Sequence, residues 1–328
     1  MDAFLDAASG LEGFAHVAVY SRTERRAAEF VRKRRIAHAT TFTDLDALAR
    51  APGIDAVYVA SPTSEHARQA TTLLRGGKHV LCEKPACSHA GELAAVLDCA
   101  RASGKAFVEA MRPLRTPAFA AVREAAARIG PTRQFVGTYC QRSSRWPAYL
   151  RGERPNAFLP EFSNGALMDL GCYAVYSAVA LLGKPARTEY AAAMLPTGVA
   201  SGGTILLRYE HGAVATLVIS KSAHGWNWSE LQGEDGTVRI NHLGDYAEAH
   251  LRRKGGETEP LCPRQPSGHA NMVHEIDAFL KLVRLGKQED DVLTWRLALD
   301  VAEVLDAARD SAGIVFPADA SRKLRSAP

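Results

Sequence analysis

The chain has 328 residues, of which 47% are hydrophobic and 23% are charged, and its formal net charge is +4. This length is enough for two domains that each bury a core, and the near balance of charge argues against a nucleic-acid-binding protein. We find no apolar run of the roughly 18–20 residues that a membrane helix needs and no secretory signal, so we expect a soluble globular protein.

Two groups of residues could suggest other classes. Basic residues gather at Arg32–His38. They are typical of a solvated helix end, and the aromatic residues that would accompany a nucleic-acid patch are missing. The six cysteines stand at positions 82, 87, 99, 140, 172 and 262, and no two of them form a C-x-x-C pair. This spacing argues against a zinc site, so we expect no metal, and scattered cysteines without a signal favour a cytoplasmic location.

The first third of the chain alternates helices and strands. Helices are predicted at 2–8, 22–34, 44–50, 64–77 and 88–104, and strands at 16–20, 37–42, 54–62, 79–85 and 106–111. We expect Ser64 to cap the helix that it begins, and Gly76 and Gly77 to close it. The β-branched run 54–62 is of the kind that a parallel sheet buries on both faces. The alternation therefore predicts a doubly wound, Rossmann-type α/β domain over residues 1–113.

The start of this pattern is unusual. The helix Asp2–Ala8 and the strand His16–Tyr20 form the second half of a βαβ unit, but no first strand and no glycine-rich turn precede them. That strand is central in a dinucleotide-binding sheet, so the strands 16–20 and 54–62 should each show an unpaired edge. Three explanations stay open. The natural protein is longer by about 15–20 residues, the chain is truncated and has lost cofactor binding, or the two strands pair directly.

After Pro113 the pattern changes to strands that follow one another. They are predicted at 132–142, 188–195, 203–210, 213–220, 228–234, 236–242 and 248–254, with hairpin signals at 209–214 and 233–238. Helices are predicted at 165–183, 270–285 and 292–312, and the segment 254–268 is the best loop candidate. We expect an α+β domain over residues 114–328 with a large, mostly antiparallel, open-faced sheet. Its open face, near Ile205, Leu207, Val214, Thr216 and Val218, would join copies into a homodimer or homotetramer.

The segment Glu83-Lys84-Pro85 follows a predicted buried strand, at the sheet end where ligands bind in open α/β folds. Lys84 can hold or polarise a substrate oxygen there, Glu83 can orient its charge, and Pro85 ends the strand. Taken alone, the segment is equally consistent with a surface turn.

The helix 165–183 carries Asp169 and Tyr173 four residues apart, and therefore on one face. Gly165 and Gly171 allow another backbone or a ligand to approach closely. A tyrosine can exchange protons if a nearby cation lowers its pKa from about 10. The alternative is a core helix in which Tyr173 is a packing residue.

In combination, four segments resemble the Gfo/Idh/MocA oxidoreductase family, and the resemblance extends over nearly the whole chain. They are Asp55–His66, His79–Pro85, Val108–Met111 and Gly165–Tyr173. Glu-Lys-Pro after a buried strand, with Asp-x-Gly-x-x-Tyr about 85 residues later, is the specific part. The tyrosine points to the branch of dihydrodiol dehydrogenases and NADP-dependent xylose dehydrogenases.

The resemblance implies roles for individual residues. Lys84 would stand beside the nicotinamide, Tyr173 would exchange the proton, and Asp169 would orient the substrate or Lys84. The implied cofactor contacts are Ser61, Pro62, His66, Glu83, Lys84 and Pro85. The implied substrate contacts are Arg112, Asp169 and Tyr173, and Arg145 is a further candidate because the segment 142–146 is polar.

Ser21 and Arg22 follow the strand 16–20, where an acidic residue would accept from the ribose of NAD. A hydroxyl and a guanidinium, with Arg25 and Arg26 close behind, suit a 2′-phosphate better. The alternative is that these arginines merely begin a helix. We therefore expect NADP(H) rather than NAD(H), and hydride transfer to or from a hydroxyl-bearing carbon of a sugar, polyol or diol. The alternative function is a non-catalytic sugar-binding or regulatory protein that has lost the dinucleotide site.

Overall fold

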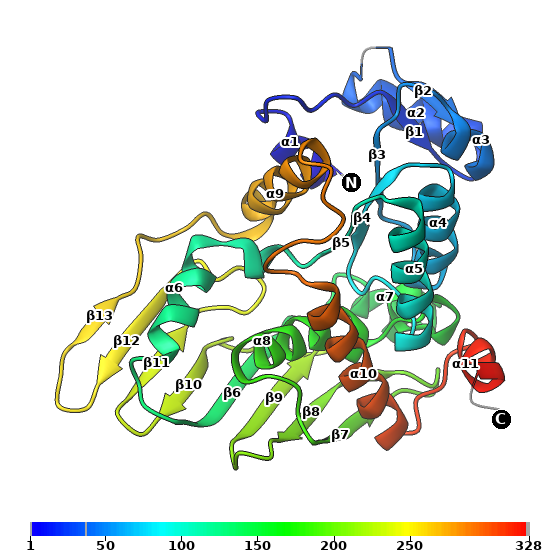
Figure 1. Cartoon of the computed structure of the whole chain (residues 1–328). Coiled ribbons are helices and arrows are strands. Elements are labelled where there is room, and N and C mark those ends of the chain that lie inside the picture. The colour runs from blue at the N-terminus through cyan, green and yellow to red at the C-terminus, as the bar shows by residue number, and fades with distance from the viewer. Residues whose placement is uncertain (1, 37, 326–328) are drawn as a thin grey trace.

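The computed structural model describes residues 2–36 and 38–325 (Figure 1). In the first part, helices and strands alternate as predicted, and Ala37 of the predicted strand 37–42 lies outside the described residues. The elements are α1 (Asp2–Ala8), β1 (Ala18–Tyr20), α2 (Glu24–Arg34), β2 (Thr40–Phe42), α3 (Leu45–Arg50), β3 (Ala56–Val59), α4 (Thr63–Arg75), β4 (His79–Glu83), α5 (Ala90–Ser103) and β5 (Phe107–Ala110).

The parallel strands of this part form two separate sheets. β1 pairs with β2, and β3, β4 and β5 form a second sheet with β4 in its centre. β1 and β3 belong to different sheets, so the explanation that these strands pair directly is wrong. The space between β1 and β3 is bordered by Phe4 of α1. The ring of Phe4 stacks on Tyr58 of β3 with 3.9 Å between the ring centres.

The basic end of α2 is held against α1. Lys33 donates to Asp2 at 2.8 Å, and Arg34 pairs with Asp6. These two members of the basic segment therefore bind acids of the same chain, in agreement with the helix-end interpretation.

The start of α4 differs from the prediction. The helix begins at Thr63, Pro62 is its N-cap residue, and no side chain caps it. Pro62 is still extended, with φ −60° and ψ 146°, and Thr63 is the first helical residue, so Ser64 already lies inside the helix. The predicted cap at Ser64 is therefore wrong.

The second part is built on an eight-stranded sheet in the order β13-β12-β11-β10-β6-β9-β8-β7. β6 and β9 are parallel, and the other neighbours are antiparallel, including the predicted hairpins β8–β9 and β10–β11. Its strands are β6 (Thr132–Cys140), β7 (Arg187–Met194), β8 (Ala200–Arg208), β9 (Val214–Ser220), β10 (Ser229–Gly233), β11 (Gly236–Ile240), β12 (Ala249–Arg253) and β13 (Thr258–Pro260). β13 lies in the segment predicted as a loop, and that prediction is wrong for its three residues.

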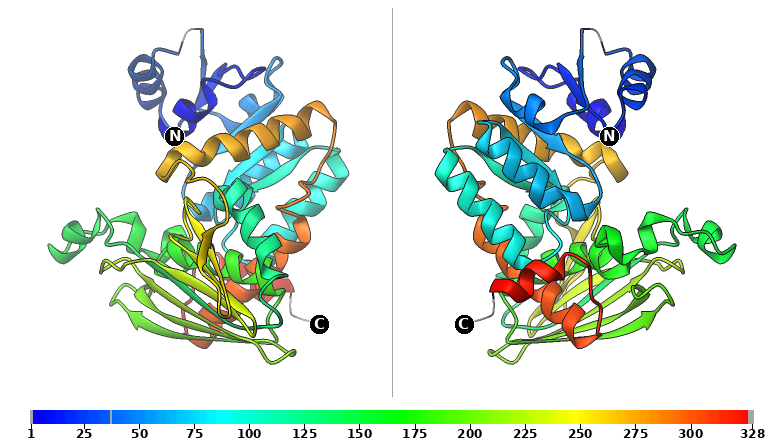
Figure 2. Two further views of the ribbon diagram at one scale, coloured as in Figure 1. Left: turned by 90° about the vertical axis from the view of Figure 1, so that its left-hand side faces the viewer. Right: turned by 90° about the vertical axis from the view of Figure 1, so that its right-hand side faces the viewer.

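Helices cover one face of this sheet, and the sheet lies at the opposite end of the molecule from β1 and β2 (Figure 2). The helices in contact with its strands are α6 (Pro117–Ala126), α8 (Cys172–Leu182) and α10 (Trp295–Ser311). This part of the chain also contains η1 (Arg112–Arg115), α7 (Trp146–Leu150), α9 (Met272–Arg284) and α11 (Asp319–Arg325). Ile205 and Leu207 are fully buried on the covered face, whereas Val214, Thr216 and Val218 lie on the other. Placing Ile205 and Leu207 on the open face was wrong, because side chains alternate along a strand.

The predicted helix 165–183 is a π-helical turn, Leu167–Gly171, that continues into α8. Together with residues before it, the segment Pro160–Leu182 is long and apolar enough to cross a membrane, which corrects our expectation about apolar runs. However, 78% of its most apolar window is buried inside the protein. It is the helix on which the large sheet packs, and such core helices pass the same test of length and composition.

The last helices return to the first part of the chain. α9 lies beside α1, and Trp295 of α10 donates to the carbonyl oxygen of Phe107 at 3.0 Å (Figure 1). These contacts bring residues of the parallel sheets and residues of the large sheet to a common site.

Candidate active site

Lys84 and Asp169 form the centre of the site. Lys84 stands directly after β4, and its Nζ donates to Oδ1 of Asp169 at 2.9 Å and to the main-chain oxygen of Asp169 at 2.8 Å. Two acceptors from one residue fix the position of the ammonium group more firmly than a single ion pair would.

The π-helical turn presents Asp169 to the lysine. Gly165, with a φ of +120°, precedes the turn, and the amide of Asp169 donates to the Gly165 oxygen at 3.1 Å. A Cβ on Gly171 would lie 3.1 Å from the Ile219 side chain, so the turn packs directly on β9. π-helical turns of this kind are frequent at functional sites.

A second lysine that sequence reasoning did not single out reaches the same carboxylate. Lys221 follows β9, is 2% exposed, and its Nζ lies 2.7 Å from Oδ2 of Asp169. The signal was a lysine at the end of the run 213–220, but nothing in the sequence showed that β9 would end beneath the turn.

These contacts decide the charge of both partners. Burial opposes the charged form of Lys84, yet the Asp169 carboxylate and weaker contributions from neighbouring groups together outweigh burial and raise the pKa of Lys84 well above its usual value. Burial likewise opposes the Asp169 anion, yet Lys84 and Lys221 lower the pKa of Asp169. At neutral pH the site holds an ammonium group and a carboxylate.

Tyr173 lies beneath the ammonium group. The Nζ of Lys84 is 4.6 Å from the centre of its ring, and the ring of Tyr139 packs at 5.3 Å from it. Among the described residues no group hydrogen-bonds to the Tyr173 hydroxyl, which leaves it available to a ligand. Burial raises the pKa of Tyr173 to about 12, against the opposing charges of Lys84 and Arg112.

Carboxyl groups shape the region behind Lys84. Glu83 accepts from the hydroxyl of Tyr58, and the peptide bond between Lys84 and Pro85 is cis. Glu109 accepts from Tyr176 at 2.6 Å and from the amide of Ala86 at 3.1 Å. Burial raises the pKa of Glu109 to about 7 despite these hydrogen bonds.

His66 connects the two loops that follow β3 and β4. Its Nδ1 lies 2.9 Å from the oxygen of Pro85, and its Nε2 lies 2.8 Å from the oxygen of Ser61. The ring is 1% exposed and does not line the neighbouring cavity. The structure thus places His66 behind these loops, where it can hold them in position.

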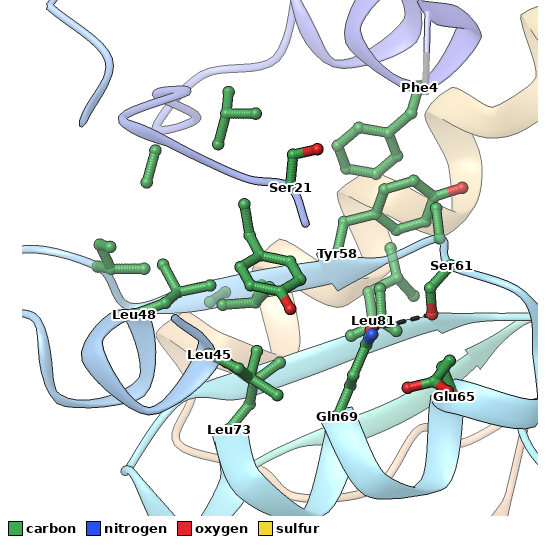
Figure 3. Close-up of a pocket in the computed structure, with 18 of the residues that line it drawn as sticks. Phe4, Ser21, Leu45, Leu48, Tyr58, Ser61, Glu65, Gln69, Leu73 and Leu81 are labelled. Carbon is green, nitrogen blue, oxygen red and sulfur yellow. Dashed lines mark hydrogen bonds between the residues drawn. The ribbon is translucent and has the colours of Figure 1, made fainter. Parts of the chain in front are cut away.

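A cavity of about 530 Å³ separates the two parallel sheets (Figure 3). Its walls include β1 and β3, whose facing edges pair with no described strand. Aliphatic side chains such as Leu45 and Leu73 form its base, and Ser61 donates to Gln69 at its rim.

The basic and hydroxyl groups at the cavity fit one end of a dinucleotide. Ser21, Arg22, Arg26 and Arg68 line it. These groups can bind a ribose or a phosphate, and Lys84 and the Glu83 loop can border a nicotinamide ring. A glycine-rich turn that would bind the pyrophosphate is not present within residues 2–36 and 38–325.

The two arginines expected near the substrate differ in position. Arg112 is 8% exposed and donates to Asn271 and to the oxygen of Gly268, with Asp245 at 3.4 Å. The positive charge of Arg112 acts to lower the pKa of Tyr173. Arg145 is exposed at the start of α7, and its side chain makes no hydrogen bond or ion pair with the described part of the chain. The structure therefore brings Arg112 to the site, whereas a contact of Arg145 with the substrate stays a prediction.

No cluster of three metal-binding side chains occurs within the described ranges. The six cysteines are free thiols, and Cys82, Cys87, Cys140 and Cys172 are buried.

Comparison with known proteins gives matches over both parts of the chain. Residues 2–110 match the model of an "oxidoreductase family, NAD-binding Rossmann fold", and residues 119–239 match the "GFO/IDH/MocA C-terminal domain". The NADP(+)-dependent scyllo-inositol 2-dehydrogenase IolU of Bacillus subtilis is 39% identical over 97% of this chain and 95% of its own length. Trans-1,2-dihydrobenzene-1,2-diol dehydrogenase of Mus musculus is 28% identical over 92% of this chain and 90% of its own length.

A solved structure supports the same arrangement. KijD10, a 3-ketoreductase from Actinomadura kijaniata crystallised with NADP and TDP-benzene, superposes with a TM-score of 0.79. The match covers 94% of this chain and 92% of that protein, at 25% sequence identity.

Proposed function

The chain belongs to the Gfo/Idh/MocA family and is an NAD(P)-dependent oxidoreductase that acts on hydroxyl-bearing carbons, and from this premise we propose how its site works. Hydride transfer takes place between NADP(H) and a sugar, polyol or diol, with Lys84, Asp169 and Tyr173 as the reacting-side residues. The observation that carries the proposal is the Lys84 ammonium, held by Asp169 at 2.9 Å and 4.6 Å from the Tyr173 ring.

Each residue has a distinct part in this reaction. When bound, the nicotinamide accepts or gives the hydride. Tyr173 receives the proton of the substrate hydroxyl during oxidation and returns it during reduction. Lys84 stabilises the negative charge that develops on the substrate oxygen, and Asp169 holds Lys84 charged and in place.

The preference for NADP(H) is supported by the charges at the cavity. Arg22 and Arg26 line it close to Ser21, at the carboxyl end of β1. The 2′-phosphate of NADP would find guanidinium donors there, whereas the residues directly after β1 are Ser21 and Arg22, with no carboxylate to accept from the 2′-hydroxyl of NAD. The NADP(+) dependence of the Bacillus subtilis relative agrees with this proposal.

A carbohydrate-like substrate is supported by the polar groups around Tyr173. Tyr139 and Arg112 border it, and His242 packs against Tyr139 with 4.5 Å between ring centres. Hydroxyl groups of a sugar, a cyclic polyol or a diol match such donors and acceptors.

Titration of the chain with NADPH and with NADH, followed by protein fluorescence, tests the cofactor. Turnover is then measured with scyllo-inositol, D-glucose, D-xylose and a trans-dihydrobenzenediol. We expect binding of NADPH near micromolar, at least tenfold tighter than NADH, and reduction of NADP with one of these alcohols. If neither cofactor binds while a sugar still stabilises the protein against heat, the non-catalytic alternative replaces this proposal.

We also propose that the chain forms a homodimer or homotetramer through the uncovered face of the large sheet. Val218 of β9 is 36% exposed there and Met194 of β7 is 43% exposed. Threonines and valines at the centre of this face offer an apolar surface. Sedimentation of the chain checks the state, and Val218→Lys, which places a charge on the face, should favour the monomer.

The proposed location is the cytoplasm. It is supported by the six free cysteines, since thiols persist in a reducing compartment.

A further inference from the structure

Lys221 is a buried lysine that faces the site from the large sheet. Its Nζ lies 2.7 Å from Oδ2 of Asp169, 3.4 Å from the oxygen of Ala157, and 5.2 Å from the centre of the Phe158 ring. Its main chain is fixed as well, because its amide donates to Ser201 at 2.7 Å and its carbonyl oxygen accepts from Ser143 at 2.8 Å.

The two lysines divide one carboxylate between them. Lys84 binds Oδ1 of Asp169 and Lys221 binds Oδ2, so neither ammonium group has the whole carboxylate. Lys84 and Asp169 alone would form a neutral pair. With Lys221 the three groups carry a formal charge of +1, and the Lys84 ammonium of this cluster lies 4.6 Å from the centre of the Tyr173 ring.

An excess positive charge is what a developing alkoxide needs. Charge on an oxygen in a partly buried site is stabilised by fixed cations far more than it is in water. A lysine that is already neutralised by its own carboxylate stabilises an anion less than one that shares that carboxylate.

We propose that Lys221 is a positioning residue of this site, which takes one oxygen of Asp169 and thereby keeps a net positive charge at Lys84. It acts through Asp169 and does not touch the substrate. The inference rests on the proposed function for its effect on turnover, but the sharing of the carboxylate can be tested without turnover.

Several titratable groups besides the Lys84–Asp169–Lys221 cluster surround Tyr173 and also influence its pKa. They are Glu83 at the end of β4, Arg112 of η1 and Cys172 beside it in the chain, while Tyr139 of β6 packs against its ring. None of them contacts the ammonium group of Lys221 by a hydrogen bond or ion pair among the described residues, so a change at Lys221 reaches Tyr173 through Asp169 and Lys84.

The kinetic test compares Lys221→Met, Lys221→Gln and Lys221→Arg. Gln removes the charge but keeps a donor, and Arg keeps the charge. Lys78→Met is the matched control, because Lys78 is also buried, at 7% exposure, but donates to the oxygen of Ala51 away from the site. We expect Met and Gln to lower kcat about 10–100-fold with an unchanged Kd for NADPH. In Lys221→Met and Lys221→Gln, the pH profile of alcohol oxidation should move about one unit to higher pH. In Lys221→Arg, which keeps the charge, kcat and the pH profile should return toward those of the wild type.

The second test measures the acetylation of individual lysines by mass spectrometry. Without Lys221, Lys84 gains the whole carboxylate and loses a repelling neighbour, so its ammonium group should be acetylated at least threefold more slowly. A purely structural role predicts the reverse, since a loosened site would expose Lys84.

The outcomes separate the two proposals. Slower acetylation together with the kinetic changes supports the role of Lys221. If Lys221→Met and Lys221→Gln match Lys78→Met in both tests, or if Lys84 is acetylated faster, the role is refuted. If the unmodified chain turns over no substrate, the proposed function fails, and the acetylation result alone decides whether the carboxylate is shared.

Discussion

The ammonium nitrogen of Lys84 lies 4.6 Å from the centre of the Tyr173 ring, although Lys84 follows β4 of the parallel sheet and Tyr173 lies in α8, 89 residues later. Lys84 directly follows a strand of the parallel sheet, and Tyr173 belongs to the helix on which the eight-stranded sheet packs. This contact therefore requires both parts of the chain to be folded against each other. A positive charge next to a phenol favours the loss of the phenolic proton, which is the property that a proton-transferring tyrosine needs.

Removal of the Tyr173 hydroxyl should abolish most activity while leaving the fold intact. We expect Tyr173→Phe to lower kcat about 10²–10⁴-fold with little effect on NADPH binding, because the hydroxyl is needed only for proton transfer. Tyr190→Phe serves as the control. Its hydroxyl is also buried, but donates to the oxygen of Gly202 away from the site. Full turnover by Tyr173→Phe would remove the tyrosine from the mechanism.

The pKa of about 12 at Tyr173 has opposite consequences for the two directions of the reaction. At neutral pH the phenol holds its proton, so it can act as the acid in reduction but rarely as the base in oxidation. We therefore expect kcat/KM for alcohol oxidation to rise with pH, by up to tenfold per unit, from pH 7 to 9. Reduction should stay nearly constant over the same range. Steady-state rates in both directions check this, and equal pH dependence in the two directions would contradict it.

Cofactor choice should depend on Arg22. We expect Arg22→Ala to weaken the binding of NADPH about 10–100-fold and to leave NADH unchanged, since the loss concerns one charge-assisted contact to a phosphate. Arg25→Ala is a matched control on the same helix end. Arg25 pairs with Glu29 at 3.0 Å and does not line the cavity. A parallel loss of NADPH and NADH affinity in Arg22→Ala would mean that this arginine does not distinguish the two cofactors.

Much of the fold could be predicted from local patterns. The alternation of helices and strands before Pro113 predicts parallel strands, because a crossover connection, usually a helix, must join one parallel strand to the next. The turn signals near Gly212 and Asp235 predict hairpins, and therefore the antiparallel pairs of the large sheet. The proximity of Lys84 and Asp169, by contrast, is implied only by the resemblance to the family, and neither motif alone predicts it. The sheet patterns depend on residues close together in the sequence, and the expectation of a site at Lys84 depends on the general rule that ligand sites lie at strand ends.

The rest depends on packing between distant segments. Lys221 meets Asp169 because β9 runs parallel to β6 and ends beneath the π-helical turn, and no local signal encodes that register. The gap between β1 and β3 likewise follows from which strands find partners. His66 resembles a residue at the start of a helix, but only the fold brings the oxygen of Pro85 to its ring.

Glu109 makes the stability depend on pH in a window that can be named. Its pKa is raised from 4.5 to about 7 in the folded protein, so between these values the folded state holds a proton that the unfolded state has lost. Stability therefore falls as pH rises through the window and loses at most about 3 kcal/mol. Glu109→Gln cannot titrate, so its free energy of unfolding should not show this fall. The difference between the free energies of unfolding of Glu109→Gln and the wild type should therefore shift in favour of the variant between pH 5 and 7. Denaturant titrations at each pH measure it, with the exposed Glu124→Gln as control.

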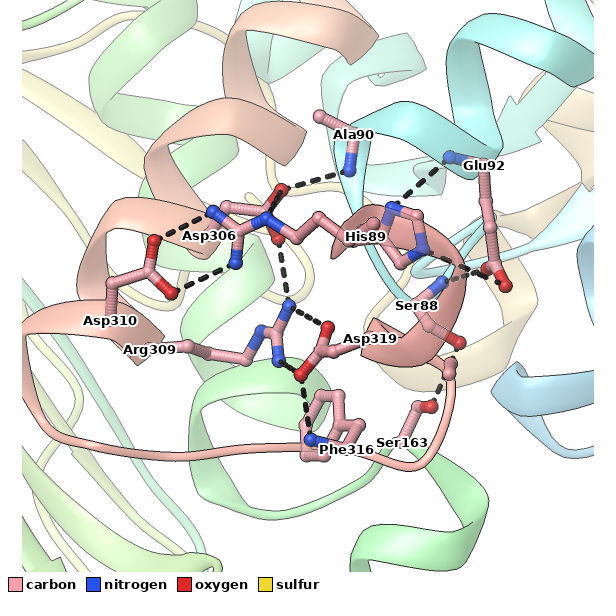
Figure 4. Close-up of polar contacts among 12 residues, drawn as sticks. Ser88, His89, Ala90, Glu92, Ser163, Asp306, Arg309, Asp310, Phe316 and Asp319 are labelled. Atoms are coloured by element: carbon pink, nitrogen blue, oxygen red, sulfur yellow. Dashed lines mark hydrogen bonds and ion pairs between the residues drawn. The ribbon is translucent and has the colours of Figure 1, made fainter. Parts of the chain in front are cut away.

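Arg309 should be the most sensitive ion-pairing residue of the C-terminal segment. Its guanidinium is fully buried and binds both oxygens of Asp319, at 2.8 and 2.9 Å, and one oxygen of Asp306 at 3.0 Å (Figure 4). Asp306 also accepts from the amide of Ala90 at 3.0 Å, so this cluster ties α10 and the start of α11 to the start of α5.

Truncation of this arginine leaves the Asp319 carboxylate buried without its cation and leaves Asp306, among the described residues, with Arg322 as its only cation, at 3.9 Å. We expect Arg309→Met to lower the free energy of unfolding by about 3–5 kcal/mol. Burial acts to raise the pKa of Asp319, but the hydrogen bonds from Arg309 outweigh burial with the help of neighbouring groups, and the pKa is lowered in the folded protein. Part of the stabilisation is therefore present at neutral pH and is lost as pH falls through the acid range. Arg296→Ala on the same helix is the control, because its side chain is 78% exposed and its pair with Asp300 should contribute under about 1 kcal/mol. Equal effects of the two substitutions in denaturant titrations would show that the buried cluster contributes no more than a surface pair.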